Sequence, residues 1–473
     1  MTTDETLALL RDTLRGTEYD NRVFLVGGYV RDKLLGRAPG KLEDIDLVIE
    51  DDALVLAEVL YRRGASRIRP VTFETFGTAM VKVAPKRTPE TEWAQVELVT
   101  ARAETYRHGS RKPIVTPGTL QTDAERRDFT VNTFLENLHT GEIVDPTGQG
   151  RADLQARLLR TPLDPDTTFA DDPLRMLRAC RFAAKLGFTI ETATLAAIHK
   201  NAFKCTPEYG ISFERVRDEL NKTLLAPGAA TGLEQMRETG LLKLFAPELA
   251  HLHGVTQNRY HKYDVWEHTL VALGNLPPDA SLLVRLGVLL HDVGKLPTRT
   301  VDTDGNVHFY EHEEVGAKIA QDVLTRLRYS ADEIKTVVQL VALHMRYGAY
   351  NASTWTEAAV RRLIRTVGPL RTDLFTLARA DVSACNTDDY PVFADLDGLQ
   401  ARMEQIENTA HVTQATSPLD GQAIIVLLGI KPGPIVGKIK DALTDAVVAG
   451  ELAPDDIEGA ERMARDLFTQ LTQ

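Results

Sequence analysis

The feature that most constrains the fold is the segment FLVGGYVRDKLLGRAPGKLEDID, residues 24 to 46. It reads as a strand, a tight turn, a short basic helix and the start of a second strand. The glycine pair Gly27 and Gly28 lets the backbone approach a phosphate group without a Cβ in the way. Asp44 and Asp46 lie two residues apart in an extended stretch, so their carboxylates face the same side. This layout predicts an α/β domain that holds a divalent metal beside a phosphate-containing ligand.

Local charge supports an anionic ligand at this segment. A helix N-terminus attracts anions, and Arg31 and Lys33 lie close enough to the glycines to add positive charge. The chain as a whole carries a net charge of −12, which argues against a surface covered in nucleic acid. Taken singly, a Gly-Gly turn is usually only a turn and an acidic pair is usually solvated. Their combination is what indicates a binding site.

Hydrophobic periodicity predicts an α+β fold, with a mixed α/β head followed by a largely helical remainder. The chain has 473 residues, which suggests about three domains. An amphipathic helix is expected at residues 52 to 63, and strands are expected at residues 22 to 27, 44 to 50, 78 to 84 and 95 to 100. From about residue 170 the apolar spacing is helical. We expect breaks at Pro227-Gly228, at Pro277-Pro278 and from Thr409 to Pro418.

The sequence contains no signal for export or membrane insertion. The N-terminus, MTTDETLALLRDTL, lacks a basic start and an apolar core, and no apolar run reaches the roughly 18 residues of a membrane helix. Cys180, Cys205 and Cys385 are far apart and show no CxxC spacing, so we interpret them as reduced core residues. A cytoplasmic protein is expected.

Two further motifs complete a recognisable set. ERRDFTVN, residues 125 to 132, follows a loop with Gly and Pro, and DDPLRMLRACRF begins at Asp171. With VGGYVRD and the DID pair, these motifs occur in the order typical of class II tRNA nucleotidyltransferases and bacterial poly(A) polymerases. The chain resembles that family over nearly its whole length, although the resemblance is thin at residues 186 to 255 and 386 to 416.

The resemblance implies roles for individual residues of the head. Asp44 and Asp46 match the pair that binds two Mg²⁺ ions, which activate the RNA 3′ hydroxyl and neutralise the triphosphate. Glu97 lies where the family often has a third carboxylate, although it could equally be a solvent-facing strand residue. The incoming nucleotide is expected to contact the glycine pair, Arg31, Arg126, Arg127, Asp128 and Asn132, with Asp128 near the ribose. DPTGQGRADL, from Asp145 to Leu154, resembles the hinge between head and neck.

In this family a protein helix selects the base, through a Glu-Asp-x-x-Arg pattern. The residues that correspond to this pattern here are Asp171, Asp172 and Arg175. Carboxylate and guanidinium groups can read a base because they offer hydrogen-bond acceptors and donors that complement its edge. Asp172 before Pro173 is also a standard helix N-cap. Arg175, Arg178 and Arg181 recur at helical spacing, which also fits a basic stripe.

The sequence departs from the family pattern at three places. Asp171 replaces glutamate, Thr133 replaces alanine, and the loop from Arg102 to Asp123 differs from that of many full CCA-adding enzymes. In this family that loop bears on whether the final adenosine is added. Addition of CCA, of CC only and of A only therefore all stay open.

A second set of candidate ligands occupies the middle of the chain. Imidazole and carboxylate groups suit a divalent transition metal or Mg²⁺, in a mononuclear or dinuclear site with a bound hydroxide. The set resembles the HD phosphohydrolase superfamily and consists of His268, His291, Asp292, His312, His344 and Asp381. The resemblance implies hydrolysis of a 2′,3′-cyclic or 2′ phosphate at RNA ends. Lys295 would contact the substrate phosphate or complement a helix dipole.

The resemblance divides the chain into a nucleotidyltransferase head (1–145), a helical neck (146–230), an HD domain (231–390) and a helical tail (391–473). In the tail, LLGIKPGPIVGKIKDAL from Leu427 to Leu443 either contacts RNA phosphates or only connects two helices. The expected substrates are CTP, ATP and the tRNA 3′ end; the oligomeric state stays open. The alternatives are a poly(A) polymerase and an HD nucleotide hydrolase whose head only binds a ligand.

Overall fold

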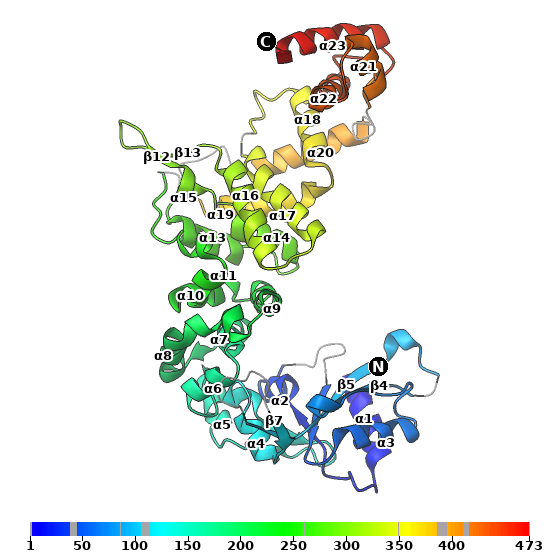
Figure 1. Cartoon of the computed structure of the whole chain (residues 1–473), viewed down its shortest axis with the longest axis vertical. Coiled ribbons are helices and arrows are strands. Elements are labelled where there is room, and N and C mark those ends of the chain that lie inside the picture. The colour runs from blue at the N-terminus through cyan, green and yellow to red at the C-terminus, as the bar shows by residue number, and fades with distance from the viewer. Residues whose placement is uncertain are drawn as a thin grey trace. The chain divides into compact units, whose positions relative to one another are not determined.

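The computed structural model describes residues 2–37, 45–85, 87–105, 114–258, 261–348, 350–385, 395–409 and 416–472 (Figure 1). Asp44, part of the loop between Arg102 and Asp123, and most of the predicted break after Thr409 lie outside these residues. The chain forms two compact units, Met1–Phe245 and Ala246–Gln473. The α+β class is confirmed, with the large sheet in the first unit, whereas the four-part division stays a prediction.

The described part of the first unit contains a seven-stranded mixed sheet, in the order β3-β4-β5-β2-β1-β8-β9. β2 and β5 run parallel, and the other adjacent strands are antiparallel. The strands are β1 (Phe24–Val26), β2 (Ile45–Ile49), β3 (Val71–Phe73), β4 (Thr78–Val83), β5 (Ala94–Thr100), β8 (Leu135–Asn137) and β9 (Ile143–Val144). The four predicted strands are confirmed as β1, β2, β4 and β5, whereas β3, β8 and β9 were not predicted.

One face of the sheet is buried and the other is partly exposed, and Asp46 and Glu97 lie on the exposed face. Ala79, Val81, Val96 and Leu98 are fully buried, whereas the alternate residues of β4 and β5 are partly or fully exposed. Helix α3 (Ala53–Arg62) packs on β4 and β5, and α1 (Thr3–Leu14) packs on α3. Since strand side chains alternate, Asp46 and Glu97 point away from the face that these helices cover.

The other described elements of the first unit are mostly helices. They are α2 (Gly28–Leu34), α4 (Leu120–Glu125), α5 (Gly150–Ala156), α6 (Pro165–Asp171), α7 (Leu174–Leu186), α8 (Thr192–Asn201), α9 (Phe213–Leu224), α10 (Ala229–Glu238) and α11 (Leu241–Phe245). The short strands are β6 (Arg102–Thr105) with β7 (Ile114–Pro117), and β10 (Leu158–Leu159) with β11 (Thr189–Ile190). α7 packs against α9 and α10, and these two helices hold it in position on the side away from the sheet.

The second unit is helical apart from a short hairpin in its described residues, β12 (Arg299–Val301) and β13 (Val307–Phe309). Its helices are α12 (Pro247–Ala250), α13 (Val265–Gly274), α14 (Leu282–Leu290), α15 (Lys295–Thr298), α16 (His312–Arg326), α17 (Ala331–Leu343), α18 (Glu357–Val367), α19 (Arg371–Ser383), α20 (Leu396–Thr409), α21 (Gly421–Leu428), α22 (Pro434–Ala449) and α23 (Ile457–Thr472). No described helix is long and apolar enough to cross a membrane.

The C-terminal helices α21, α22 and α23 share their own apolar core, which includes Ile424, Ile439 and Leu443. Gly429 ends α21 and Gly433 precedes α22, so the glycine-rich stretch of the tail connects these two helices. Contact of this connection with RNA stays a prediction.

Candidate functional site

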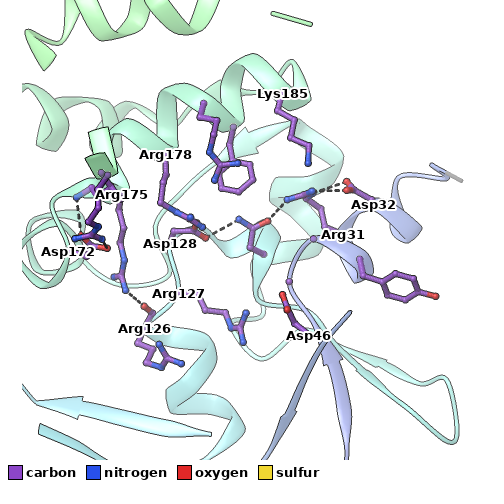
Figure 2. A pocket seen from close by; sticks show the side chains of 18 residues that line it. Arg31, Asp32, Asp46, Arg126, Arg127, Asp128, Asp172, Arg175, Arg178 and Lys185 are labelled. Atoms are coloured by element: carbon purple, nitrogen blue, oxygen red, sulfur yellow. Dashed lines mark hydrogen bonds and ion pairs between the residues drawn. The ribbon is translucent and has the colours of Figure 1, made fainter. Parts of the chain in front are cut away.

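A cavity of about 780 Å³ in the first unit lies between the sheet and α7 (Figure 2). Eight basic side chains and four carboxylates line it, so its local charge is positive although the chain is acidic. The charged lining residues are Arg31, Arg126, Arg127, Arg175, Arg178, Arg181, Lys185, Arg215, Asp32, Asp46, Asp128 and Asp172. A cavity with this excess of cations favours a multiply charged anion.

The turn after β1 brings the backbone close to Asp46. Gly27 has a φ of +75°, which favours glycine, and it precedes α2. A Cβ at this position would lie 3.4 Å from Asp46 Oδ2 and 4.0 Å from an Arg127 guanidinium nitrogen. Gly27 and Gly28 both line the cavity. The glycine pair therefore leaves room for a ligand between the backbone, the carboxylate and an arginine.

Glu97 is the direct neighbour of Asp46 in the parallel pairing of β2 and β5. Residues paired in this way point to the same face of a sheet, with the strands about 4.8 Å apart. Glu97 is exposed and lines a separate cavity beside β4 rather than the basic one. Its catalytic role stays a prediction, and the structure places it next to the carboxylate that it would assist.

A buried chain of polar contacts connects α2 with α7 (Figure 2). Arg31 donates to Asn132 Oδ1 at 2.6 Å, Asn132 donates to Asp128 Oδ1 at 2.9 Å, and Arg178 Nε donates to Asp128 Oδ2 at 2.9 Å. Burial would raise the pKa of the Asp128 carboxyl, but Arg178 and Asn132 outweigh it and lower this pKa to about 2. Asp128 is therefore an anion that fixes two cavity-lining side chains, Arg178 and Asn132.

Arg31 was expected to supply charge to the ligand together with Lys33. Arg31 lines the cavity, yet it is buried and donates twice to Asp32, at 2.8 and 2.9 Å. Lys33 is not among the lining residues, and its Nζ lies 2.6 Å from Glu136. The positive charges predicted to act on the ligand from this helix are thus paired with the carboxylates of Asp32 and Glu136.

Arg126 and Arg127 are held by Asp123, a residue that the sequence did not single out. Both guanidinium groups donate to its buried carboxylate, with shortest contacts of 2.5 and 2.9 Å. Burial opposes the charge of Asp123, but these arginines lower its pKa below the ordinary value. Arg175 from α7 donates to the backbone carbonyl of Arg126 at 2.5 Å. These contacts join the RRDFTVN motif to the helix that was predicted to read the base.

Asp172 acts both as a cap and as an ion-pair partner. Its Oδ1 accepts the backbone N–H of Leu174, the first residue of α7, at 3.1 Å, although the N-cap position itself is Pro173 and not Asp172 as predicted. Arg215 from α9 lies 3.0 Å from Asp172 Oδ2 and also lines the cavity. Asp171 is the last residue of α6 and is not among the lining residues.

α7 also brings to the cavity Arg181, the third arginine of the predicted basic stripe, and two residues that had not been singled out, Phe182 and Lys185. Arg181 pairs with the buried Glu219 at 2.5 Å, and its guanidinium lies 4.1 Å from the centre of the Phe182 ring. Phe182 and Lys185 both line the cavity. The Phe182 ring is buried, and the guanidinium groups of Arg31, Arg178 and Arg181 lie 5.4, 5.5 and 4.1 Å from its centre, so the ring packs against these arginines.

The second unit brings all six predicted HD ligands together. Within this unit, His268, His291 and Asp381 form one group and Asp292, His312 and His344 form another, each with ligand atoms within 4.8 Å of one another. The Asp292 carboxylate lies between the groups, with Oδ2 3.2 Å from His291 Nε2 and Oδ1 3.5 Å from His312 Nε2. The His-Asp pair follows the end of α14 instead of lying within a helix.

The histidine tautomers indicate that a cation belongs at this site. The Nδ1 atoms of His291, His312 and His344 lie 2.7, 2.9 and 2.7 Å from backbone carbonyl oxygens, so in the neutral ring each Nε2 presents a lone pair to the centre. His312 Nε2 and His344 Nε2 face each other at 3.3 Å. Two lone pairs at this distance repel unless a proton or metal ion lies between them. The residues present therefore fit one or two divalent metal ions.

Close backbone packing holds the two ligand groups in register. A Cβ on Gly294 would lie 2.1 Å from the carbonyl oxygen of His312 and 2.6 Å from the backbone nitrogen of Gly316. Only glycine allows this approach between the loop after Asp292 and the start of α16. The sequence reasoning had not singled out Gly294.

Lys295 is buried, and its Nζ lies 2.7 Å from Asp292 Oδ2 and 2.6 Å from Gln257 Oε1. It belongs to α15, a helix of four residues in which it counts to the last turn, so both interpretations of Lys295 stay predictions. His261 and Cys385 form a further group with His268 and had not been singled out. Burial and the nearby Lys295 lower the pKa of His261 to about 3.

Comparison with known proteins gives matches in both units. Residues 23–160 match the poly A polymerase head domain, residues 187–252 the probable RNA and SrmB-binding site of polymerase A, and residues 259–381 the HD domain. The A-adding tRNA nucleotidyltransferase of Deinococcus radiodurans is 38% identical over 347 residues, which cover 71% of this chain and 77% of that protein. The CC-adding tRNA nucleotidyltransferase of Thermus thermophilus is 34% identical over 91% of this chain and 90% of its own length.

Solved structures share the fold. The Bacillus stearothermophilus CCA-adding enzyme in complex with CTP aligns over 100% of both chains with a TM-score of 0.66 and 24% identity. The Thermotoga maritima CCA-adding enzyme complexed with tRNA aligns over 100% of this chain and 99% of that one, with a TM-score of 0.55 and 20% identity.

Proposed function

The chain belongs to the tRNA nucleotidyltransferase family with a poly A polymerase head domain, and we propose that it adds cytidine, adenosine or both to the tRNA 3′ end from CTP and ATP. The observation that carries this proposal is the position of Asp46. Its carboxylate lies beside the open backbone of Gly27, in a cavity with eight basic side chains. A nucleoside triphosphate is the substrate class that needs both a carboxylate-bound metal and this many cations.

The residues of the cavity suit Mg²⁺ as cofactor. Asp46 supplies hard oxygen donors, Gly27 leaves space beside them, and Asp44 lies two residues before Asp46 in the sequence. Bound Mg²⁺ supplies charge neutralisation at the triphosphate and lowers the pKa of the attacking RNA hydroxyl. Arg127, whose guanidinium lies close to Gly27, is proposed to hold the phosphates, and the contacts from Arg31 through Asn132 and Asp128 to Arg178 link the parts of the cavity wall.

Base selection is assigned to Asp172 and Arg175 at the start of α7. Both line the cavity, and both are oriented by contacts with other elements, Asp172 by Arg215 and Arg175 by the Arg126 carbonyl. Groups that are held in one orientation discriminate between base edges, because a wrong base leaves their polar atoms without partners. The relatives include both an A-adding and a CC-adding enzyme, so the nucleotide must be measured.

Substitution of Asp46 tests the transferase. Asp46→Asn is expected to abolish incorporation of labelled CTP and ATP into tRNA transcripts, since an amide binds Mg²⁺ far more weakly than a carboxylate. Glu97→Gln tests the adjacent carboxylate, with a loss of kcat expected if Glu97 takes part. Full incorporation by Asp46→Asn would contradict the proposal.

The HD unit is proposed to hydrolyse a 2′,3′-cyclic or 2′ phosphate at RNA 3′ ends. Its six candidate ligands, which include the Asp292 carboxylate between the two groups, suit a metal centre that activates water. Removal of the phosphate would expose the RNA hydroxyl that the head requires. Lys295, whose Nζ lies 2.7 Å from Asp292 Oδ2, is proposed to contact the phosphate. The test is metal content and phosphate release from tRNA with a 2′,3′-cyclic end, compared between the wild type and His312→Ala. Release by the variant equal to that of the wild type would refute it.

A further inference from the structure

A second cavity, of about 330 Å³, opens beside β3, β4 and β5. Its lining combines aromatic, apolar and amide side chains with a single cation and a single carboxylate among the described lining residues. These residues are Phe73, Phe76, Thr78, Met80, Gln95, Glu97 and Arg102. The near-balanced charge distinguishes this cavity from the basic one, so it does not suit a triphosphate.

The two phenylalanines are unusually exposed for their size. Phe73 is 44% exposed and Phe76 is 52% exposed, and β3, which carries Phe73, lies at the edge of the sheet. An Arg102 guanidinium nitrogen donates to the Phe76 carbonyl oxygen at 3.0 Å, which holds the residues after β3 in place. Exposed aromatic rings beside an arginine are the combination that binds the bases of single-stranded nucleic acid.

The position of this cavity relative to Asp46 indicates what it could bind. Across the sheet, Met80 on β4 pairs with Glu97 on β5, and Glu97 pairs with Asp46 on β2. Met80 and Glu97 line the second cavity, whereas Asp46 lines the basic cavity with Gly27, which follows β1. The two cavities therefore lie on opposite sides of the Asp46–Glu97 pair, on the same face of the sheet.

In-line nucleotidyl transfer needs the attacking hydroxyl on the side of the α-phosphorus opposite to the bond that breaks. The hydroxyl oxygen attacks from that side, and pyrophosphate leaves on the other. If the basic cavity holds the triphosphate, the acceptor end of the RNA therefore has to reach Asp46 from outside the part of the site that holds the pyrophosphate. The second cavity, on the β5 side of Asp46, is a place from which it can do so.

We propose that this cavity binds the 3′-terminal nucleotide of the acceptor RNA, with its base stacked on Phe73 or Phe76. The inference rests on the proposed transferase function and adds a subsite to it. Arg102 provides the charge for one backbone phosphate, and Gln95 and Glu97 offer polar groups to the base and ribose. Stacking does not depend on base identity, so one subsite serves successive acceptor ends.

The test uses Phe73→Ala and Phe76→Ala in the full chain, with Val55→Ala as the control. Val55 is 49% exposed and lies on α3, which covers the opposite face of the sheet and is not part of either cavity. Each cavity variant is expected to raise the KM for tRNA by roughly 5- to 100-fold, the range for loss of one stacked base, with the KM for CTP or ATP unchanged. Phe76→Trp should retain the wild-type KM, and Val55→Ala should change neither constant.

A direct binding readout separates this inference from the proposed function. A tRNA minihelix with 2-aminopurine as its last base should lose fluorescence on binding the wild-type protein, and this quenching should be absent in Phe73→Ala or Phe76→Ala. Unchanged quenching and unchanged KM for tRNA in both variants would overturn the inference while transfer persists. No transfer by the wild-type protein to any tRNA would instead overturn the proposed function, and the quenching would still report whether the base binds here.

Discussion

The ion pair between Asp128 and Arg178 supports a quantitative prediction for the variant Arg178→Met. Asp128 is 6% exposed, and Arg178 donates to its Oδ2 through two nitrogens, at 2.9 and 2.5 Å. The folded protein lowers the pKa of Asp128 from 3.8 to about 2. Because one pKa unit corresponds to about 1.4 kcal/mol, this difference contributes about 2 kcal/mol of stability at neutral pH.

Removal of the guanidinium leaves a buried carboxylate with only Asn132 and a backbone N–H as donors. Arg178→Met is therefore expected to lower the free energy of unfolding of the first unit by about 2 to 4 kcal/mol at pH 7. The double variant with Asp128→Asn should recover part of this loss, because no buried charge remains. Arg217→Met, which removes a more exposed pair with Asp218, should cost less than about 1 kcal/mol.

The assay is native-state hydrogen exchange of the α7 amides in urea, which reports the free energy of unfolding of the first unit. The pH dependence follows from the sign of the pKa shift. The folded-state pKa is depressed, so the contribution of Asp128 is fully present above about pH 4 and is lost as the pH falls toward 2. The difference between wild type and Asp128→Asn should shrink over that range. A coupling energy near zero in the double-mutant cycle would refute the reasoning.

Three further predictions concern other parts of the molecule. Gly294→Ala should lower the melting temperature of the second unit and its metal content, because the new Cβ would lie 2.1 Å from the His312 carbonyl oxygen; calorimetry and elemental analysis measure both, and an unchanged melting temperature would contradict the packing. Arg215→Ala should raise the KM for nucleotide and weaken discrimination between CTP and ATP, since Asp172 loses the partner 3.0 Å away; unchanged selectivity in single-turnover assays would exclude this role. Removal of metal by chelation should abolish phosphate release by the HD unit, and residual release at the original rate would show that its six ligands serve another purpose.

The sequence predicted those parts of the structure that depend on local patterns. Apolar strand-like runs identified β2, β4 and β5, and the Asp172-Pro173 pair indicated the start of α7. The spacing of the histidines did not show that they converge, but their order in a known family did. Periodicity therefore led to the main strands of the sheet, and family order led to side chains that the fold brings together.

Long-range partners could not be predicted from local patterns. Arg215 is 43 residues from Asp172, and Glu219 is 38 residues from Arg181, so only the packing of α9 on α7 brings them together. The same holds for the pair of Lys33 and Glu136. This ion pair explains why Lys33 does not line the cavity in which it was expected to contact the ligand. The phenylalanines of the second cavity sit in a three-residue strand and the turn after it, which are too short to show a pattern.

The most direct test of the central claim is incorporation of labelled CTP and ATP, singly and together. The acceptors are tRNA transcripts that end before CCA, after the first cytidine and after both cytidines. The wild type and His291→Ala should both extend at least one of these acceptors, while Asp46→Asn should extend none. Ordered addition of two cytidines and one adenosine would identify a full CCA activity, and cytidine or adenosine alone a CC-adding or A-adding one. Failure of the wild type to extend any acceptor, or loss of transfer in His291→Ala, would contradict the assignment of transfer to the head.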